Sequence, residues 1–215
     1  MTAAYKYCDP VGYKAMLDGS FRLRRLSFYR TQEAGGVRDP LDGRSEVRMT
    51  RTFGPGDRVG VEGWPDNNSL ISVEGKDTVV RWGGGLMAAE ISPLVFCASL
   101  SRADRFWQNE HDARYDCLLG IFNFQRLASH ISQALHRIGI TNTFDVCRIN
   151  YRDPLPMTGD NIPAPDACVK SAAFSQENEI RAIFFDENED PANASQEIDI
   201  QVGVAGLLMC LKEPK

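Results

Sequence analysis

Apolar and polar residues follow two different periods along this chain, and together the two periods predict a sheet with a few helices. In residues 21–26 apolar residues alternate with arginines, which is the period-2 pattern of a half-buried strand. Between Phe124 and Ile138 the apolar residues Leu127, Ile131 and Leu135 lie four apart, which predicts a helix that ends at a glycine.

Further segments with the same patterns complete the outline. Strands are predicted at residues 5–7, 94–101, 115–124, 144–151, 180–185 and 198–211, the last as one or two strands, and helices at residues 11–17 and 103–111. Strands outnumber helices and do not alternate with them regularly. This arrangement favours an α+β fold with largely antiparallel sheets over a doubly wound fold.

The chain of 215 residues is long enough for one large domain that carries a long insertion. The expected insertion covers about residues 31–85, where Gly, Asp, Arg and Pro are frequent and turn dipeptides recur. Short strands are predicted inside it at residues 46–53, 69–73 and 77–82, and the triple glycine 83–85 is interpreted as a flexible corner. We therefore expect a single domain over residues 1–215.

The net charge of -5 gives the whole chain no attraction to nucleic acid or to anionic membranes. The first residues lack the pattern of a signal peptide, and no apolar run reaches the ~18 residues that a membrane helix needs. Charge is nevertheless uneven, with arginines frequent in residues 22–58 and acids in residues 177–199. These residues either pair across the fold as solvated surface, or the arginines form an anion-binding face opposite a carboxylate site.

The six cysteines are scattered and include no C-x-x-C pair, so the spacing of a zinc site is absent and no metal is expected. Several lie in apolar, strand-like runs, where a free cysteine behaves as a small apolar residue. We therefore expect buried, reduced thiols and an intracellular, cytoplasmic location. A catalytic Cys–His pair is an alternative, although none of the three histidines is placed beside a cysteine by the sequence.

Early in the chain, tyrosine and arginine side chains suited to an anionic ligand occur together. Tyr5, Lys6 and Tyr7 form one predicted strand, and Arg22 and Arg24 share the polar face of the next. Arginine binds phosphate through two parallel hydrogen bonds, and tyrosine stacks on a ring or hydrogen-bonds a ribose. The alternative is a strand with ordinary exposed basic residues.

In the middle of the chain, a buried strand becomes polar where it ends. Ser99 and Ser101 lie two residues apart there, so their hydroxyls face the same side. Such hydroxyls hold a ligand or orient a carboxylate. Serines also simply end strands.

Late in the chain, two carboxylates lie at the start of a strand. Glu177 and Glu179 are two residues apart and share one face of an extended chain, with Asn178 facing the other way. A carboxylate beside a sugar stabilises an oxocarbenium-like transition state, and a second one orients or deprotonates the nucleophile. The alternative is an acidic loop entering a strand, with Glu179 and Arg181 forming a surface ion pair of little energetic consequence.

The order of these landmarks resembles the DUF2971-type bacterial proteins. The residues that carry the resemblance are Tyr5-Lys6-Tyr7, the short helix before Gly19, the strand Phe21-Arg22-Leu23, the turn Asp39-Pro40-Leu41-Asp42-Gly43, the strand ending in serine, Phe106-Trp107, and Glu177-Asn178-Glu179-Ile180-Arg181. That group looks distantly related to the ADP-ribosyltransferase fold, which splits NAD at the bond between nicotinamide and ribose. The resemblance implies two small packed, mainly antiparallel sheets.

The resemblance also implies roles for the candidate residues. Arg22 or Arg24 would bind the phosphate of NAD, and Ser99 would support the site. Glu179 would contact the nicotinamide ribose as the main catalytic residue, and Glu177 would assist the acceptor nucleophile. The expected function is an NAD-dependent mono-ADP-ribosyltransferase that modifies a protein or a nucleic acid, in toxin, defence or counter-defence biology.

Two other functions stay open on the sequence. One is a non-catalytic module on the same scaffold, whose arginine-rich segment binds nucleic acid or an acidic protein partner. The other is a nuclease or hydrolase that uses Glu177, Glu179 and a histidine with a divalent metal, against which the missing metal-ligand spacing weighs.

Overall fold

The computed structural model describes residues 2–31, 42, 44–53, 58–59, 71–72, 80–102, 116–152, 157–158, 166–186 and 197–213. Contacts divide the chain into two units. The larger unit comprises residues 1–44, 90–153 and 165–215, and the smaller unit comprises residues 45–89 and 154–164.

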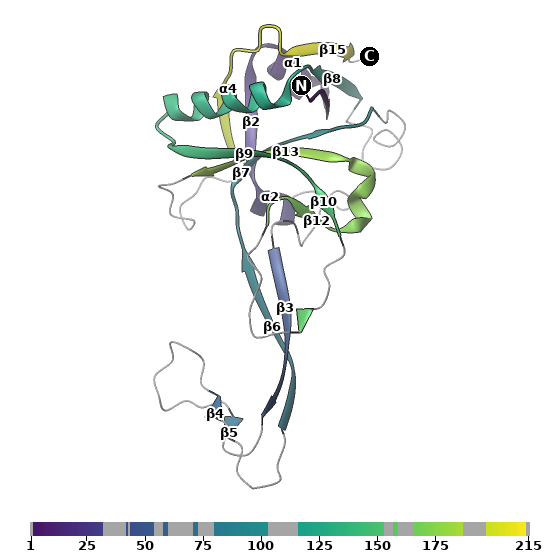
Figure 1. The fold of residues 1–215 in the computed structure, drawn as a ribbon. Coiled ribbons are helices and arrows are strands. Elements are labelled where there is room, and N and C mark those ends of the chain that lie inside the picture. Colours follow the sequence, from purple (N-terminus) through teal and green to yellow (C-terminus); the bar gives the residue numbers. More distant parts are fainter. Residues whose placement is uncertain are drawn as a thin grey trace. The chain divides into compact units, whose positions relative to one another are not determined.

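The larger unit is built on an eight-stranded sheet, whose strands are labelled in Figure 1. The strands are β1 (Ala4–Cys8), β2 (Ser20–Arg25), β7 (Leu94–Ser99), β8 (Cys117–Ile121), β9 (Asn142–Arg148), β13 (Glu179–Asp186), β14 (Glu197–Gln201) and β15 (Leu208–Lys212). Six of them follow the order β14-β2-β7-β1-β8-β15, and β13 joins β7 to β9. All of these pairs are antiparallel.

Strand β7 is the centre of this sheet because three strands pair with it. Along one edge β13 pairs with the full length of β7, with Phe184 opposite Leu94 and Glu179 opposite Ser99. Along the other edge β2 pairs with the beginning of β7, and β1 pairs with its end, where Tyr5 is opposite Ser99. The carboxyl end of β7 is therefore flanked by β1 on one edge and by β13 on the other.

One face of the sheet carries the main apolar core, which α1 (Pro10–Leu17) and α4 (Phe124–Arg137) cover. The side chain of Asp9 caps α1 by accepting a hydrogen bond of 2.6 Å from the Gly12 amide. Asn123 caps α4 in the same way, at 3.0 Å from the Arg126 amide. The apolar residues four apart in α4 are buried, so the helix predicted from their spacing is confirmed.

The opposite face carries a smaller apolar cluster and shorter elements. These are α2 (Leu26–Thr31), the parallel pair β10 (Asn150–Tyr151) and β12 (Val169–Lys170), and the 3₁₀ helix η2 (Ala172–Glu177). Sequence reasoning extended the strand of residues 21–26 too far and missed α2. Strand β2 ends at Arg25, and the Leu26 amide still donates to the Pro93 carbonyl at 3.0 Å. In the first turn of α2 the Ser92 hydroxyl then accepts from the Ser27 amide at 3.0 Å.

In the smaller unit, β3 (Arg44–Phe53) pairs with β6 (Val80–Glu90) and, in parallel, with β11 (Met157–Thr158). A second pair is formed by β4 (Arg58–Val59) and β5 (Ile71–Ser72). The interpretation of the triple glycine 83–85 as a corner is wrong, because these residues lie within β6. A strand is held by backbone hydrogen bonds, which glycine makes as other residues do.

The α+β class with a mainly antiparallel sheet and few short helices is confirmed. Instead of two small packed sheets, however, eight strands of the larger unit form one hydrogen-bonded sheet. The predicted helix at residues 103–111 lies outside the described residues. None of the described helices is long and apolar enough to cross a membrane.

The expectation that all cysteines are reduced is wrong for two of them. Cys147 and Cys168 form a disulfide, with their Cα atoms 6.1 Å apart. The fold brings these residues within bonding reach although 21 positions separate them along the chain. The four other cysteines are free.

Candidate acid–base site

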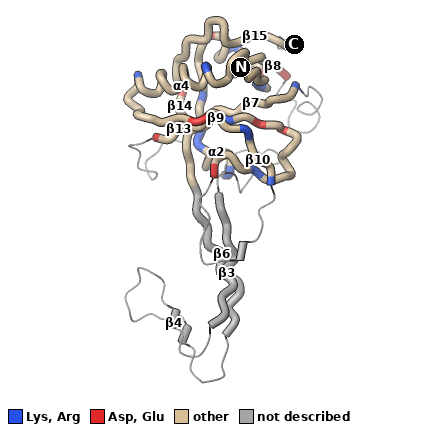
Figure 2. The backbone as a smooth tube through the Cα atoms, viewed as in Figure 1, with Lys and Arg blue, Asp and Glu red and all other residues tan. Residues whose placement is uncertain are grey.

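Five charged side chains are buried together on the second face of the sheet, near the carboxyl end of β7, which lies between β1 and β13. They are Asp42, Lys170, Glu177, Glu179 and Arg181, each at most 7% exposed. We call them the buried charge cluster. Figure 2 shows both acidic and basic positions in this part of the larger unit. A buried charge is strongly unfavourable unless it is paired and hydrogen-bonded, so the pairing within the cluster decides which groups are free to react.

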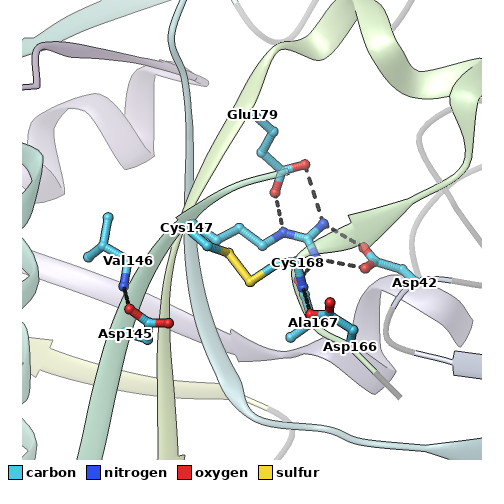
Figure 3. Close-up of a disulfide and its surroundings, with 9 residues drawn as sticks. Asp42, Asp145, Val146, Cys147, Asp166, Ala167, Cys168 and Glu179 are labelled. Carbon is cyan, nitrogen blue, oxygen red and sulfur yellow. Dashed lines mark hydrogen bonds and ion pairs between the residues drawn. A yellow bond between two sulfur atoms is a disulfide. The ribbon is translucent and has the colours of Figure 1, made fainter. Parts of the chain in front are cut away.

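Arg181 is completely paired. Its Nη1 and Nη2 bind the two carboxylate oxygens of Asp42 at 2.6 and 2.7 Å, and Nη1 also donates to the Ala167 carbonyl at 2.9 Å. Its Nε and Nη2 donate to Glu179, as Figure 3 shows. All five N–H groups of the guanidinium are thereby used. Burial opposes the charge, but Glu179 and Asp42 outweigh it and raise the pKa of Arg181.

Lys170 joins the two glutamates. Its Nζ donates to Glu177 Oε2 at 2.6 Å and to Glu179 Oε2 at 3.3 Å, and lies 4.8 Å from the centre of the Phe174 ring. Burial alone would lower the pKa of Lys170, but the charges of Glu179 and Glu177 outweigh it and raise that pKa. Lys170 is therefore an ammonium ion at neutral pH.

Glu179 is a carboxylate whose two oxygens are both occupied. Arg181 binds Oε1, and Arg181 and Lys170 both bind Oε2. Burial alone would raise the pKa of Glu179, but Arg181 and Lys170 outweigh it and hold that pKa well below its usual range. Glu179 is a fixed negative charge rather than a group that exchanges a proton near neutrality.

Glu177 differs from Glu179 both in the pairing of its carboxyl oxygens and in its pKa. Among the described residues its Oε1 has no hydrogen-bond partner, although the atom is buried. Burial, joined by the negative charge of Glu179 and opposed by Lys170, raises the pKa of Glu177 to about 8. With Glu177 protonated, the cluster balances two cations, Lys170 and Arg181, against two anions, Asp42 and Glu179. A buried carboxyl that titrates near neutral pH is suited to acid–base catalysis.

The backbone between the two glutamates is not extended as expected. Glu177 ends η2, Glu179 begins β13, and Asn178 between them has a left-handed backbone with φ 44°. The two side chains nevertheless meet at Lys170. The Ser99 hydroxyl fixes this turn by donating to the Glu177 carbonyl at 2.8 Å.

Three predicted residues from distant parts of the chain lie side by side here. Ser99 of β7 lies between the other two, directly opposite Tyr5 of β1 on one edge and Glu179 of β13 on the other. Residues opposite each other in an antiparallel pair project to the same face. Ser101 adjoins them, since its carbonyl accepts from the Ser99 hydroxyl at 3.0 Å.

Lys6 and Tyr7 are the other predicted binding residues of β1. Successive residues of a strand project to opposite faces, so Tyr7 shares the face of Tyr5, and Lys6 lies on the other face. Lys6 donates to the Cys97 carbonyl at 2.8 Å and lies 5.2 Å from the centre of the Phe96 ring, a residue of the main apolar core. Tyr7 is buried opposite Leu118 of β8.

The two predicted arginines of β2, Arg22 and Arg24, pair with acids of β14 rather than with Glu179. Arg22 binds both carboxylate oxygens of Asp199 at 2.8 and 2.9 Å, and Arg24 binds Glu197 at 3.4 Å. Arg24 is opposite Val95, four residues before Ser99 on β7, which corresponds to roughly 13 Å along a strand. These pairs agree with the first interpretation of the uneven charge, in which arginines and acids at the surface pair across the fold.

Two further arginines of the basic segment also serve the fold. Arg25 donates to the Ser92 carbonyl at 2.9 Å, and Arg30 donates to the carbonyls of Asp42 and Ile91 at 2.8 and 2.9 Å. Both are buried. Their positions give no support to a basic surface for nucleic acid in this part of the molecule.

Sequence reasoning missed Asp42, Lys170 and Tyr151, and misjudged Arg181. The sequence places Asp42 in a predicted turn, and only the alternative interpretation of Glu177 and Glu179 pairs Glu179 with Arg181, at the surface, whereas this pair is buried. Tyr151 accepts a hydrogen bond of 2.8 Å from the Glu179 amide. The one available signal was the arginine inside the apolar run 180–184, because a charged residue there needs a buried partner.

No protein-family model, curated protein or solved structure matches the chain. Among the described side chains, no group of three or more His, Cys, Asp or Glu residues is arranged to hold a metal ion. The chemistry of this chain is therefore argued from the buried charge cluster itself.

Proposed function

We propose that the chain is an NAD-dependent enzyme of the ADP-ribosyltransferase type, in which Glu177 exchanges the proton of the acceptor. The observation that carries the proposal is the meeting of Tyr5, Ser99, Glu177 and Glu179 at the end of β7, from three separate segments. At this place Glu177 combines a pKa of about 8 with an oxygen that no described group occupies.

The reaction needs two contributions from the protein. Loss of nicotinamide leaves an oxocarbenium-like ribose, which a fixed negative charge stabilises. Glu179 supplies that charge, because Arg181 and Lys170 keep it ionised. The acceptor must then lose a proton, and the unoccupied oxygen of Glu177 takes it.

Lys170 and Ser99 act as positioning residues in this proposal. Lys170 holds the Glu177 carboxyl through Oε2 and leaves Oε1 for the acceptor. Ser99 holds the Glu177 backbone. Tyr5, which is partly exposed beside Ser99, is the proposed contact for a ring or ribose of NAD.

Arg22 and Arg24 remain the proposed phosphate ligands on the basis of the resemblance to ADP-ribosyltransferases. Because both pair with carboxylates of β14, binding would require exchange of Asp199 and Glu197 for phosphate. The acceptor in the proposal is a protein or a nucleic acid, and the setting is toxin, defence or counter-defence biology in the cytoplasm.

The test is to incubate the purified chain with NAD and a cell lysate, and to measure nicotinamide release and transfer of labelled ADP-ribose. We expect Glu177→Gln to lower transfer by about 10²–10³-fold, since it cannot accept a proton. The wild-type rate should rise with pH up to about 8, where Glu177 loses its proton.

Glu213→Gln is the matched control, because Glu213 is an exposed glutamate at the end of β15 and should leave the rate unchanged. Equal, background release by the wild type and Glu177→Gln would end the proposal.

A further inference from the structure

The disulfide Cys147–Cys168 connects the sheet to segment 166–170, which supplies Lys170 to the buried charge cluster and a backbone carbonyl that binds Arg181. Cys147 lies on β9 directly opposite Arg181, and Cys168 lies in the segment 166–170. Figure 3 shows the disulfide beside the guanidinium group that Glu179 and Asp42 bind.

Two atoms of this segment contact the cluster. The Ala167 carbonyl accepts from Arg181 at 2.9 Å, and Lys170 Nζ donates to Glu177 at 2.6 Å. The position of the segment therefore determines whether Glu177 is paired and shielded from water.

Apart from the disulfide, backbone hydrogen bonds attach the segment to β10 and to the residue after it. The Asn150 amide donates to the Cys168 carbonyl at 2.8 Å, and the Arg152 amide donates to the Lys170 carbonyl at 3.0 Å. Strands β10 and β12 have two residues each, and a pair of that length is marginal by itself.

The disulfide is also open to chemical attack. Cys147 and Cys168 are both partly exposed, whereas the free thiols of Cys8 and Cys117 are buried. A chain of this size with an extensive apolar core does not depend on a disulfide in order to fold. In a reducing compartment, disulfides are usually transient and serve catalysis or redox sensing.

We propose that the Cys147–Cys168 disulfide is a redox-sensitive latch that holds segment 166–170, and with it Lys170, against the two glutamates of the buried charge cluster. A dithiol reductant opens it. One thiolate attacks a sulfur of the disulfide to form a mixed disulfide, and the second thiolate displaces the protein. Cys147 and Cys168 take two electrons and two protons, and the reductant leaves as its own disulfide.

Opening the latch exposes Glu177 to water. Because burial is the largest cause of its raised pKa, that pKa falls toward the ordinary value once the segment loosens. The consequence for catalysis, a loss of transfer activity on reduction, rests on the proposed function. The coupling between the disulfide and Glu177 does not depend on it.

The experiment follows the side-chain carboxyl carbon of Glu177 by NMR in protein labelled with ¹³C-glutamate, with Glu177→Gln as the assignment variant. The titration runs from about pH 5 to about pH 9, with and without dithiothreitol. We expect a midpoint of about 8 in the oxidised protein and a midpoint lower by about one unit or more in the reduced protein. The Asn150 and Arg152 amides should exchange with solvent faster after reduction.

Two variants control the measurement. The double variant Cys147→Ser/Cys168→Ser should reproduce the reduced titration without reductant. Cys210→Ser removes an exposed free thiol, so it should keep the oxidised midpoint and still respond to dithiothreitol. If the double variant fails to fold, reduction of the folded wild type decides the question.

An unchanged Glu177 midpoint and unchanged amide exchange after complete reduction would overturn the latch. So would alkylation of both Cys147 and Cys168 in protein purified without reductant, since no disulfide would then exist. Neither readout involves NAD, so failure of the latch and failure of the proposed reaction are told apart.

Discussion

The arginines of β2 and the arginine of β13 bind carboxylates on the same sheet, but in different surroundings. Arg22 and its partner Asp199 are both about half exposed, at 51% and 57%, whereas Arg181 and Asp42 are each 2% exposed. Water competes for the exposed pair and screens it, so such a pair contributes little to stability. Water does not solvate the charges of the buried pair, so each of them depends on its partner for stabilisation.

This difference shows why the same residue types serve different purposes in the two regions. Removing a charge from the pairs on β2 and β14 lets water replace the partner. Removing one from the buried charge cluster leaves an uncompensated ion in the interior, which either destabilises the fold or shifts the pKa of a neighbour. In Glu177, burial and the negative charge of Glu179 together raise the pKa to about 8.

The largest expected effect comes from breaking the buried pair. Arg181→Met leaves Asp42 and Glu179 without their main partner, and it should lower the free energy of unfolding by about 3–5 kcal/mol. Arg22→Met, the matched change at the exposed pair, should lower it by less than about 1 kcal/mol. Urea unfolding of the two variants measures the contrast, and similar values for both would contradict it.

An intermediate effect is expected from the pH dependence of Glu177. Its folded-state pKa, about 8, lies above the ordinary value of 4.5, so the folded state binds the proton more tightly. The resulting stability is complete below about pH 4.5, and is lost as pH rises toward about 8. Glu177→Gln keeps a neutral group there and should avoid this loss, exceeding the wild type by on the order of 3 kcal/mol at about pH 9.

Denaturant unfolding at several pH values tests the direction of this pH dependence of stability. Wild type and Glu177→Gln should converge below about pH 4.5, since Glu177 is then protonated in both the folded and the unfolded protein. A wild type that gains stability relative to Glu177→Gln as pH rises would show that the carboxyl is ionised and paired instead. Glu213→Gln, at an exposed site, should show no such trend.

The smallest expected effect belongs to the pairs on β2 and β14. Asp199→Asn should lower the unfolding free energy by about 0.2–1 kcal/mol, and this loss should shrink at about 1 M salt, which screens exposed charges. Thermal unfolding at two salt concentrations measures it. If the loss of stability persists in high salt, the Arg22–Asp199 pair is shielded from solvent in the same way as the buried Arg181–Asp42 pair.

Much of the secondary structure could be predicted because local pattern decides it. The helix of residues 124–137 follows from apolar residues four apart, and the strands β1, β7 and β13 follow from short apolar or alternating runs. The beginning of α2 and the strand through the triple glycine could not be predicted. Both involve hydrogen bonds to segments distant in sequence, the first to the Ser92 hydroxyl and the second to β3.

The candidate site was predicted in part. Ser99, Glu177 and Glu179 were recognised because two hydroxyls or two carboxylates stand close together in sequence. Lys170 and Asp42 were not, because a single lysine or a single aspartate in a turn has the same appearance whether it is exposed or buried. The expected contact between Glu179 and Arg22 or Arg24 is absent from this structure, since β14 supplies the partners of both arginines.

By itself the sequence determined the α+β class, most strand and helix positions, and the residue types available for chemistry, because these depend on neighbours a few positions apart. Only the tertiary structure decided which glutamate is fixed and which can exchange a proton. That distinction depends on burial and on Lys170, Arg181 and Asp42, which come from three separate segments and meet at one end of β7. The disulfide between Cys147 and Cys168 was decided there as well, because only folding brings their Cα atoms to 6.1 Å.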